Sequence, residues 1–176
     1  MDKVFNKAKL TTMVLLLALI AVVTLIMEHM ELPSWPVFLM MIAFFAVEQN
    51  VKMIPNILIG GAFGTLNLII LGKIWMPATV ASLGAGTASL VYVLIFVGLI
   101  VLLGDVGDIL PKIFNTYAFL YFLASSMGAA MAKPAPNLVL WIILELVGGA
   151  IIVAGCVGIG KIIAALFGGE AHNQVE

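Results

Sequence analysis

The sequence predicts an all-α integral membrane protein with six transmembrane helices, arranged as two inverted repeats of three helices. Composition is the first observation: 64% of the 176 residues are hydrophobic and 10% are charged, whereas soluble domains are about half apolar and about a quarter charged. The second is a series of apolar segments near the length that crosses a bilayer. The third is a Lys-x-x-Pro-Asn pattern that occurs once in each half of the chain.

The composition also excludes other classes of protein. Nine acidic side chains and eight lysines, with no arginine, cannot cover a soluble globule of this size. A single cysteine excludes a disulfide-stabilised secreted domain. A net charge of −1 without a basic patch argues against a nucleic-acid partner. The lipid bilayer is therefore the first expected partner.

Six apolar segments define the expected helices. The hydrocarbon core is about 30 Å thick and a helix rises about 1.5 Å per residue, so a crossing takes about 20 residues. The second segment is short, which predicts a helix that is perpendicular to the membrane, broken, or partly shielded by protein. The last is long, which predicts a tilt, an extension or a kink near Gly148-Gly149. The segments are 10–27, 35–50, 55–71, 79–103, 113–131 and 137–167, with connections at 28–34, 50–55, 73–78, 104–112 and 132–136.

The lysines set the expected orientation. With a cytoplasmic N-terminus, six lysines face the cytoplasm and two face outside, which agrees with the excess of positive charge in cytoplasmic loops. Six crossings then place the C-terminus in the cytoplasm as well. The inner lysines are Lys3, Lys7, Lys9, Lys52, Lys112 and Lys161, and the outer two are Lys73 and Lys133.

An internal repeat relates the two halves of the chain. It pairs Lys52-x-x-Pro55-Asn56 with Lys133-x-x-Pro136-Asn137, and lysine, proline and asparagine are all scarce in this sequence. The first repeat covers about residues 10–75 and the second about 79–168. Three helices are an odd number, so the copies cross the membrane in opposite directions, as in many channels and secondary transporters. A duplicated structural or anchoring protein is the alternative.

Glu145 is the most informative polar residue, because it lies within the last apolar segment. An ionised carboxylate there costs at least about 2.5–3.5 kcal/mol, so it should be protonated, paired or directed into a wet cavity. One interpretation is functional, with Glu145 coupling a proton or cation or binding a solute. The alternative is a protonated carboxyl that ties two helices together.

Other polar residues lie at the ends of the segments or within them. A proline at the start of a helix leaves the first-turn N–H groups free to point at a ligand, although plain capping by asparagine is the alternative. A carboxamide within a span is also hard to satisfy in lipid. Besides Glu145, the candidate residues of a substrate path are Trp35, Glu48, Gln49, Asn50, Asn56, Asn67, Asn115 and Asn137.

Small residues predict close helix packing. Gly60-x-x-x-Gly64 and the run of small residues at 82–89 both allow helix backbones to approach each other. Six short helices make a thin bundle, so we also expect part of this surface to form a homo-oligomer.

The segment Ser34-Trp35-x-x-Phe38-Leu39, followed by Ala43-x-Phe45-Ala46 and Gln49, resembles the corresponding stretch of the YcdZ-like family of small bacterial inner-membrane proteins, a domain of unknown function. Similar lengths and a similarly repeated phenylalanine-containing helix extend the likeness over most of the chain. The resemblance implies an inner-membrane location and a transport role, and it implies no substrate and no functional residues.

These observations lead to three hypotheses of function. The first is a channel or facilitator for a small polar solute of urea, amide or amine size, which becomes proton-coupled if Glu145 titrates with the solute. Its mainly neutral path suits an organic anion poorly. The second is a substrate-binding membrane subunit of a vitamin or metal transporter, with its ligand near residues 28–35 and 133–137. The third is a structural or regulatory membrane protein without transport. We expect no enzyme activity, metal site or cofactor, because no catalytic set, metal-ligand group or phosphate-binding loop is visible.

Overall fold

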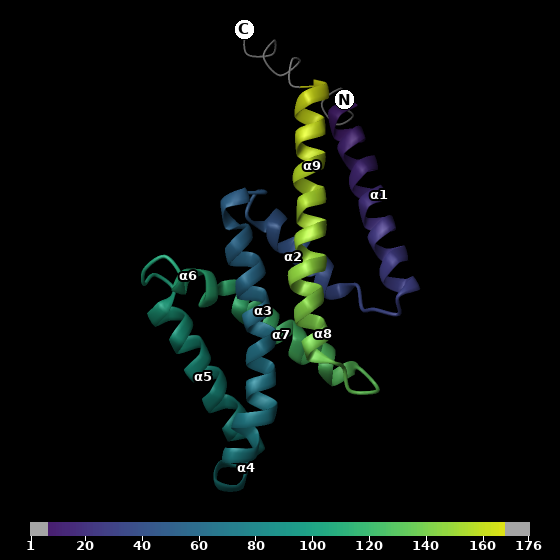
Figure 1. Cartoon of the computed structure of the whole chain (residues 1–176). Helices are drawn as coiled ribbons and strands as arrows, with labels where there is room; N and C mark the ends of the chain where they lie inside the picture. Colours follow the sequence, from purple (N-terminus) through teal and green to yellow (C-terminus); the bar gives the residue numbers. More distant parts are fainter. Residues whose placement is uncertain (1–6, 168–176) are drawn as a thin grey trace, which may run out of the picture.

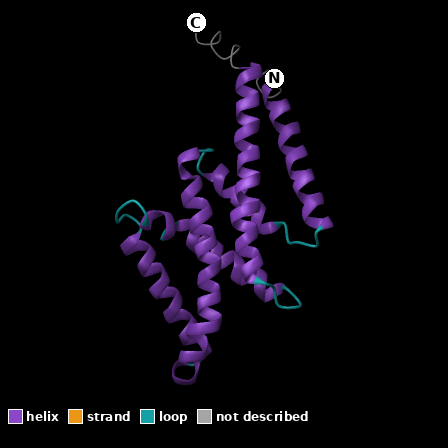
Figure 2. Cartoon of the chain, in the orientation of Figure 1, coloured by secondary structure: helices purple, strands orange, loops and turns teal. Residues whose placement is uncertain are grey.

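The computed structural model describes residues 7–167, which form helices joined by short loops, without a strand among them (Figures 1 and 2). The predicted all-helical fold is therefore confirmed. Lys3, one of the lysines expected to face the cytoplasm, and Gly168, the expected end of the second repeat, lie outside the described residues. The elements are α1 (Lys7–His29), α2 (Trp35–Ala46), the 3₁₀ turn η1 (Val51–Met53), α3 (Ile54–Ile70), the π-helical turn η2 (Leu71–Trp75), α4 (Met76–Leu83), α5 (Ala85–Leu103), α6 (Leu110–Ile113), α7 (Thr116–Met131), α8 (Leu138–Ile143), the π-helical turn η3 (Leu144–Gly148) and α9 (Gly149–Phe167).

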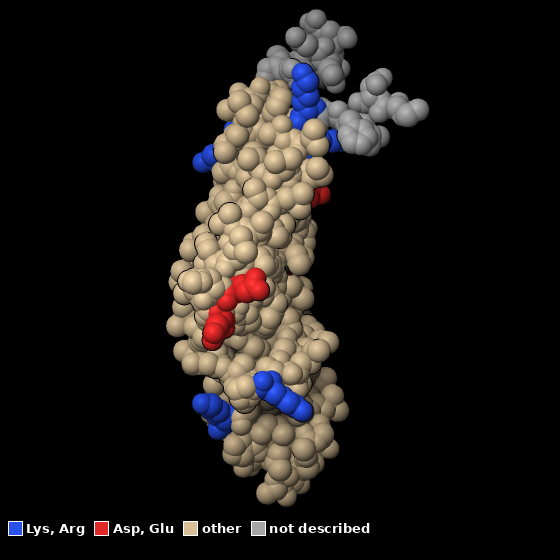
Figure 3. All heavy atoms as spheres, turned by 90° about the vertical axis from the view of Figure 1, so that its right-hand side faces the viewer, with Lys and Arg blue, Asp and Glu red and all other residues tan. Residues whose placement is uncertain are grey.

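Four continuous helical stretches are long and apolar enough to cross a membrane. On the face shown in Figure 3, lysines and acidic side chains gather in a few separate places, and most of the remaining surface carries neither. These features are those of a membrane protein. The four stretches are Lys7–His29, Val51–Leu83, Ala85–Leu103 and Leu138–Phe167.

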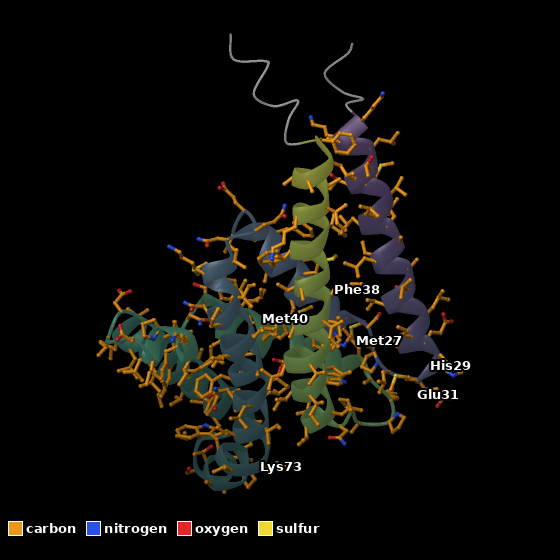
Figure 4. The ribbon with its side chains drawn as sticks, turned by 45° about the horizontal axis from the view of Figure 1, so that its top comes forward. Met27, His29, Glu31, Phe38, Met40 and Lys73 are labelled. Atoms are coloured by element: carbon orange, nitrogen blue, oxygen red, sulfur yellow. The ribbon has the colours of Figure 1, made fainter. Side chains whose placement is uncertain are left out.

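The two remaining apolar helices are short and pack one face against the bundle. α2 has 12 residues and α7 has 16, against the roughly 20 of a full crossing. Met40 of α2 lies between α3 and α9 (Figure 4), where it would meet a Cβ added at Gly61 or Gly149. Tyr121 of α7 is fully buried. Each short helix thus has one face against protein, whereas Ile42 of α2 and Met127 of α7 are exposed. This partial shielding agrees with the prediction made for the second segment.

The predicted connection at 73–78 is wrong. The helix that begins with α3 continues through η2 and α4 to Leu83, and the chain turns at Gly84, whose φ of 74° suits glycine. Lys73 and Pro77 indicated a loop because proline lacks an N–H and its ring collides with the carbonyl four residues earlier. The π-helical turn η2 includes that position, and such local adjustments let membrane helices tolerate proline.

Two apolar clusters form the interior, and α7 contributes to both. Tyr121 belongs to the cluster that joins α2 and α9 with α1, and Phe122 to the cluster around Tyr92 and Phe96 of α5. α3 packs against α7 more extensively than any other two elements pack together. The α3–α7 pair therefore connects the two sides of the molecule.

Glycines set the close approach of α3 to α7. A Cβ added at Gly60 would meet the side chain of Asn115, and one at Gly64 would meet the Ala118 carbonyl and lie 2.8 Å from the backbone nitrogen of Phe122. The packing role predicted for Gly60-x-x-x-Gly64 is confirmed. The run 82–89 differs, because it contains the turn between α4 and α5, and a Cβ on either of its glycines would meet nothing within 4 Å.

The last helix changes its winding where an irregularity was expected. Its π-helical turn η3 ends at Gly148, directly before α9. A Cβ at Gly148 would lie 2.7 Å from Val37, and one at Gly149 would lie 2.5 Å from Met40. The glycine pair therefore lets the last helix pack closely against α2.

Replacing Asn115 with alanine is expected to lower the free energy of unfolding by about 2 kcal/mol. The Asn115 side chain caps α7 by accepting from the backbone N–H groups of Tyr117 (3.0 Å) and Ala118 (3.1 Å). It also donates to the carbonyl of Asn56 on α3 (3.0 Å), which the substitution leaves without that donor. Denaturant unfolding in detergent measures the change.

Asn50→Ala is the matched control, because Asn50 caps only η1 through one exposed bond to the N–H of Lys52 (3.1 Å). We expect it to cost less than about 1 kcal/mol. Equal losses for the two variants would contradict a tertiary role for Asn115.

Candidate functional site

Three fully buried polar side chains meet where α3, α7 and η3 come together. They are Thr65 on α3, Ser125 on α7 and Glu145 on η3, each with 0% of its surface exposed. We call them the carboxyl cluster. Figure 1 shows the region where α8 passes into α9 beside α3 and α7. The fold thus buries the Glu145 carboxyl together with two hydroxyls.

The hydrogen bonds of the cluster have a defined direction. The Thr65 hydroxyl donates to Oε1 of Glu145 at 2.6 Å, and the Thr65 and Ser125 hydroxyl oxygens lie 2.6 Å apart. A hydroxyl has one proton to donate. When Glu145 is ionised, Thr65 gives its proton to Oε1 and Ser125 donates to Thr65, so the donors run from α7 through α3 to Oε1. A proton on Oε1 would reverse both bonds.

The second carboxyl oxygen, Oε2 of Glu145, is buried and has no hydrogen-bond partner among the described residues. The nearby Tyr121 hydroxyl donates instead to the carbonyl of Pro36 at 2.9 Å. A buried polar atom without a partner costs about 1–3 kcal/mol, and more when it is charged. The site therefore accommodates a neutral carboxyl better than an ionised one. Oε2 remains available for a hydrogen bond to another group.

The π-helical turn explains how Glu145 reaches the interior. Leu144 and Glu145 are consecutive and both buried, whereas Leu146 and Val147 are exposed. π turns shift the register of a helix and are frequent at functional sites. Gly148 closes the turn with no side chain to obstruct α2.

The carboxyl cluster lies deep within the apolar part of the molecule. Lys52 and Lys73 are consecutive charged residues along the chain, and Thr65 stands between them in a continuous helix. At about 1.5 Å per residue, Thr65 is about 20 Å from the level of Lys52 and about 12 Å from that of Lys73. Together these spans match the thickness of the hydrocarbon core, about 30 Å.

Three of the predicted asparagines are helix caps. The side-chain oxygens of Asn50, Asn115 and Asn137 each accept from backbone N–H groups at the start of η1, α7 and α8. The Asn56 side chain instead donates to the Pro111 carbonyl of α6 at 3.5 Å and so joins α3 to α6. For Asn50, Asn115 and Asn137 the geometry favours the capping alternative over two polar mouths.

Asn67 is satisfied without a ligand. Its amide donates to the Phe63 carbonyl of its own helix at 2.8 Å, and its side-chain oxygen accepts from the Tyr92 hydroxyl at 3.0 Å. These two partners satisfy the Asn67 carboxamide within the protein, contrary to the expectation that it would be hard to satisfy within a span. Asn67 therefore fastens α5 to α3.

The other candidates lie away from Glu145 or pack against aromatic rings. Glu48 and Gln49 are exposed after α2, with φ values of 53° and 59°. Trp35 stands edge-on to Trp141, with ring centroids 4.9 Å apart. The structure thus brings Glu145 together with Thr65 and Ser125, which are not among the predicted path residues, and with none of the other candidates.

Two cavities are described, and Glu145 and Asn67 line neither. The first, about 220 Å³, lies between α1, α9 and the end of α2. The second, about 190 Å³, lies between the lower part of the α3 helix and the start of α8. The first is lined by Thr12, Leu16, Phe45, Gln49, Cys156, Ile159, Gly160 and Ile163, and the second by Ile69, Lys73, Pro136, Asn137, Leu138 and Val139.

Fold and site together define an all-helical protein with a polar cluster buried among helices long and apolar enough to cross a membrane. No protein-family model, curated protein or solved structure matches the chain. The resemblance to the YcdZ-like family stays a prediction. Within residues 7–167, no three His, Cys, Asp or Glu side chains gather as a metal site.

Replacing Thr65 with valine is expected to lower the free energy of unfolding by about 2–3 kcal/mol. Valine keeps the shape but removes the hydroxyl that serves both Glu145 and Ser125. Thr65→Ser, which keeps the hydroxyl and loses one methyl, should cost about 1 kcal/mol. Denaturant unfolding in detergent compares the two variants, and a valine variant as stable as the serine variant would refute the hydrogen-bonded cluster.

Proposed function

We propose that this protein is a membrane carrier for a small polar solute, with the carboxyl cluster at its centre and Glu145 as the proton-exchanging group. The observation that carries the proposal is the buried Oε2 atom of Glu145, which has no partner among the described residues. A carboxyl that served only to join helices would be expected to use both oxygens, because the unpaired one is costly. An intramembrane ionisable residue is by default a functional candidate.

The closed surroundings of Glu145 support a carrier rather than an open channel. All three side chains of the carboxyl cluster are fully buried, and neither described cavity includes them. A carrier holds its centre closed while access alternates between the two sides. The helix that contains α3 and the helix that contains α9 each include a π-helical turn, η2 and η3, where helix geometry is locally adjustable.

The order of the helices supports two inverted repeats as the framework. A long, a short and a long helix follow one another as α1, α2 and α3, and again as α5, α7 and the α8–α9 stretch. The two Lys-x-x-Pro-Asn segments lie at the starts of α3 and α8. In carriers built this way, the transport site lies between the repeats, and Thr65 and Glu145 come from different halves.

We also propose a bacterial inner-membrane location with both termini in the cytoplasm. The lysine distribution supports this orientation. Large apolar side chains of α1 and α5 are exposed, as in helices that face lipid or a second copy of the chain. A homo-oligomer remains part of the proposal.

Solute uptake into proteoliposomes tests the proposal. A panel of urea, acetamide, methylammonium and acetate is offered at equal concentration, with and without an imposed pH gradient. We expect uptake of at least one solute to exceed that of protein-free liposomes and to change with the gradient. Rates equal to those of protein-free liposomes for the whole panel, with protein that elutes as a folded species in detergent, would overturn the proposal.

A further inference from the structure

The cavity of about 190 Å³ that includes Lys73 has a lining suited to one kind of ligand. We call it the Lys73 cavity. Lys73 was expected in an outer loop, but it lies in the helix that continues from α3, near that helix's lower end in Figure 4. The cavity is therefore formed between two helical elements.

Its polar side chains are donors. Lys73 carries an ammonium group with three donors. The side-chain oxygen of Asn137 already accepts from the N–H groups of Val139 (3.1 Å) and Leu140 (3.3 Å), which leaves its NH₂ group to face a ligand. No acidic residue lines the cavity. A ligand must therefore supply acceptor oxygens, and a negative charge on them would make the bonds stronger.

The rest of the lining is apolar and comes from Ile69, Pro136, Leu138 and Val139. An inorganic anion would gain nothing from this wall, whereas a short aliphatic chain would be sheltered by it. The volume of about 190 Å³ equals about six water molecules at roughly 30 Å³ each. That space suits a carboxylate with a short aliphatic chain.

The Lys73 cavity lies on the same seam between helices as the carboxyl cluster. Thr65 and Ile69 are four residues apart and share a face of α3. Lys73, in the π-helical turn η2 of the same continuous helix, lines the same cavity as Ile69. Leu138 and Glu145 are seven residues apart on the opposing helix, and α3 packs against both α8 and η3. The cavity thus lies about two helical turns, about 12 Å, from the carboxyl cluster.

We infer that the Lys73 cavity binds a small aliphatic carboxylate, with the carboxylate on Lys73 and Asn137 and the chain against Ile69 and Leu138. Resting on the proposed function, the cavity is the approach to Glu145 from the Lys73 side. One carboxylate and one proton, carried on Glu145, would cross together without net charge. The inference reverses the expectation that the path suits an organic anion poorly, which did not take Lys73 into account.

Calorimetric titration of the full-length protein in zwitterionic nanodiscs tests the inference, with butyrate, its neutral isostere butyramide, and inorganic phosphate as probes. We expect butyrate to bind at least about tenfold more tightly than the other two. Lys73→Gln and Asn137→Asp should each weaken butyrate binding about tenfold or more, and aspartate can still cap α8. Lys52→Gln, at the far end of the same helical stretch, should leave the affinity within about twofold.

Undetectable butyrate binding by the wild-type protein, or equal butyrate affinity in the wild-type and Lys73→Gln proteins, would overturn the inference. Phosphate binding as tight as butyrate would also overturn it, because the apolar wall would then have no role. The binding test separates the two proposals. Butyrate binding without uptake of any panel solute would contradict only the carrier, and uptake with butyrate affinity unaffected by Lys73→Gln would contradict only the site.

Discussion

Replacing Gly64 with alanine is expected to lower the free energy of unfolding by about 3 kcal/mol. The new Cβ would meet the Ala118 carbonyl and lie 2.8 Å from the backbone nitrogen of Phe122. Both are backbone atoms of α7, so neither can turn aside as a flexible side chain could. The α3–α7 pair must then separate, and this separation also disturbs the bond between Thr65 and Ser125.

Gly98→Ala is the matched control for this prediction. Gly98 lies within α5, and a Cβ there would meet nothing within 4 Å. Alanine has the higher helix propensity, so we expect no loss of stability and a gain of up to about 1 kcal/mol. Denaturant unfolding in detergent measures both variants. Equal stability of the Gly64 and Gly98 variants would contradict the close packing of α3 on α7.

Replacing Glu145 with glutamine is expected to reduce solute uptake about 100-fold or more while leaving the fold intact. Glutamine has nearly the same shape, and its carbonyl oxygen can still accept from the Thr65 hydroxyl. It cannot take up or release a proton, and a positioned proton-transfer group typically contributes about 10²–10⁴ in rate. Uptake in proteoliposomes gives the rate, and denaturant unfolding in detergent checks the fold.

Glu48→Gln serves as the control, because Glu48 is exposed after α2. We expect its uptake to remain within about twofold of the wild type. If the Glu145→Gln variant takes up solute at the wild-type rate, the prediction is contradicted and the carboxyl only joins helices.

The helical class of the protein could be predicted because it depends on local properties of the chain. Apolar length alone predicted both ends of Lys7–His29 to within three residues (10–27 predicted), and it predicted the end of α5 at Leu103. The predicted start at residue 79 was wrong, because the chain turns at Gly84 before α5 begins at Ala85. Boundaries that depend on competing local signals were less accurate. Lys73 and Pro77 indicated a loop, whereas the π-helical turn η2 lets the helix continue to Gly84.

The site could be predicted only in part, because its members are far apart in the sequence. Glu145 stood out as a carboxyl within an apolar segment. Its partner Thr65 is 80 residues away, and Ser125 is 60 residues from Thr65. Threonines and serines often bond within their own helix, so nothing in the local pattern distinguished these two. The asparagines misled for the opposite reason, because a carboxamide is polar enough to suggest a site and is also a good helix cap.

Proton movement during transport tests the central claim most directly. Proteoliposomes that contain a pH-sensitive dye receive the panel solute with the fastest uptake, and the pH change is corrected for protein-free liposomes. We predict that the internal pH changes in step with wild-type uptake and that both signals are lost in the Glu145→Gln variant. Wild-type uptake without a pH change, or an undiminished pH change in the variant, would contradict Glu145 as the proton-exchanging group.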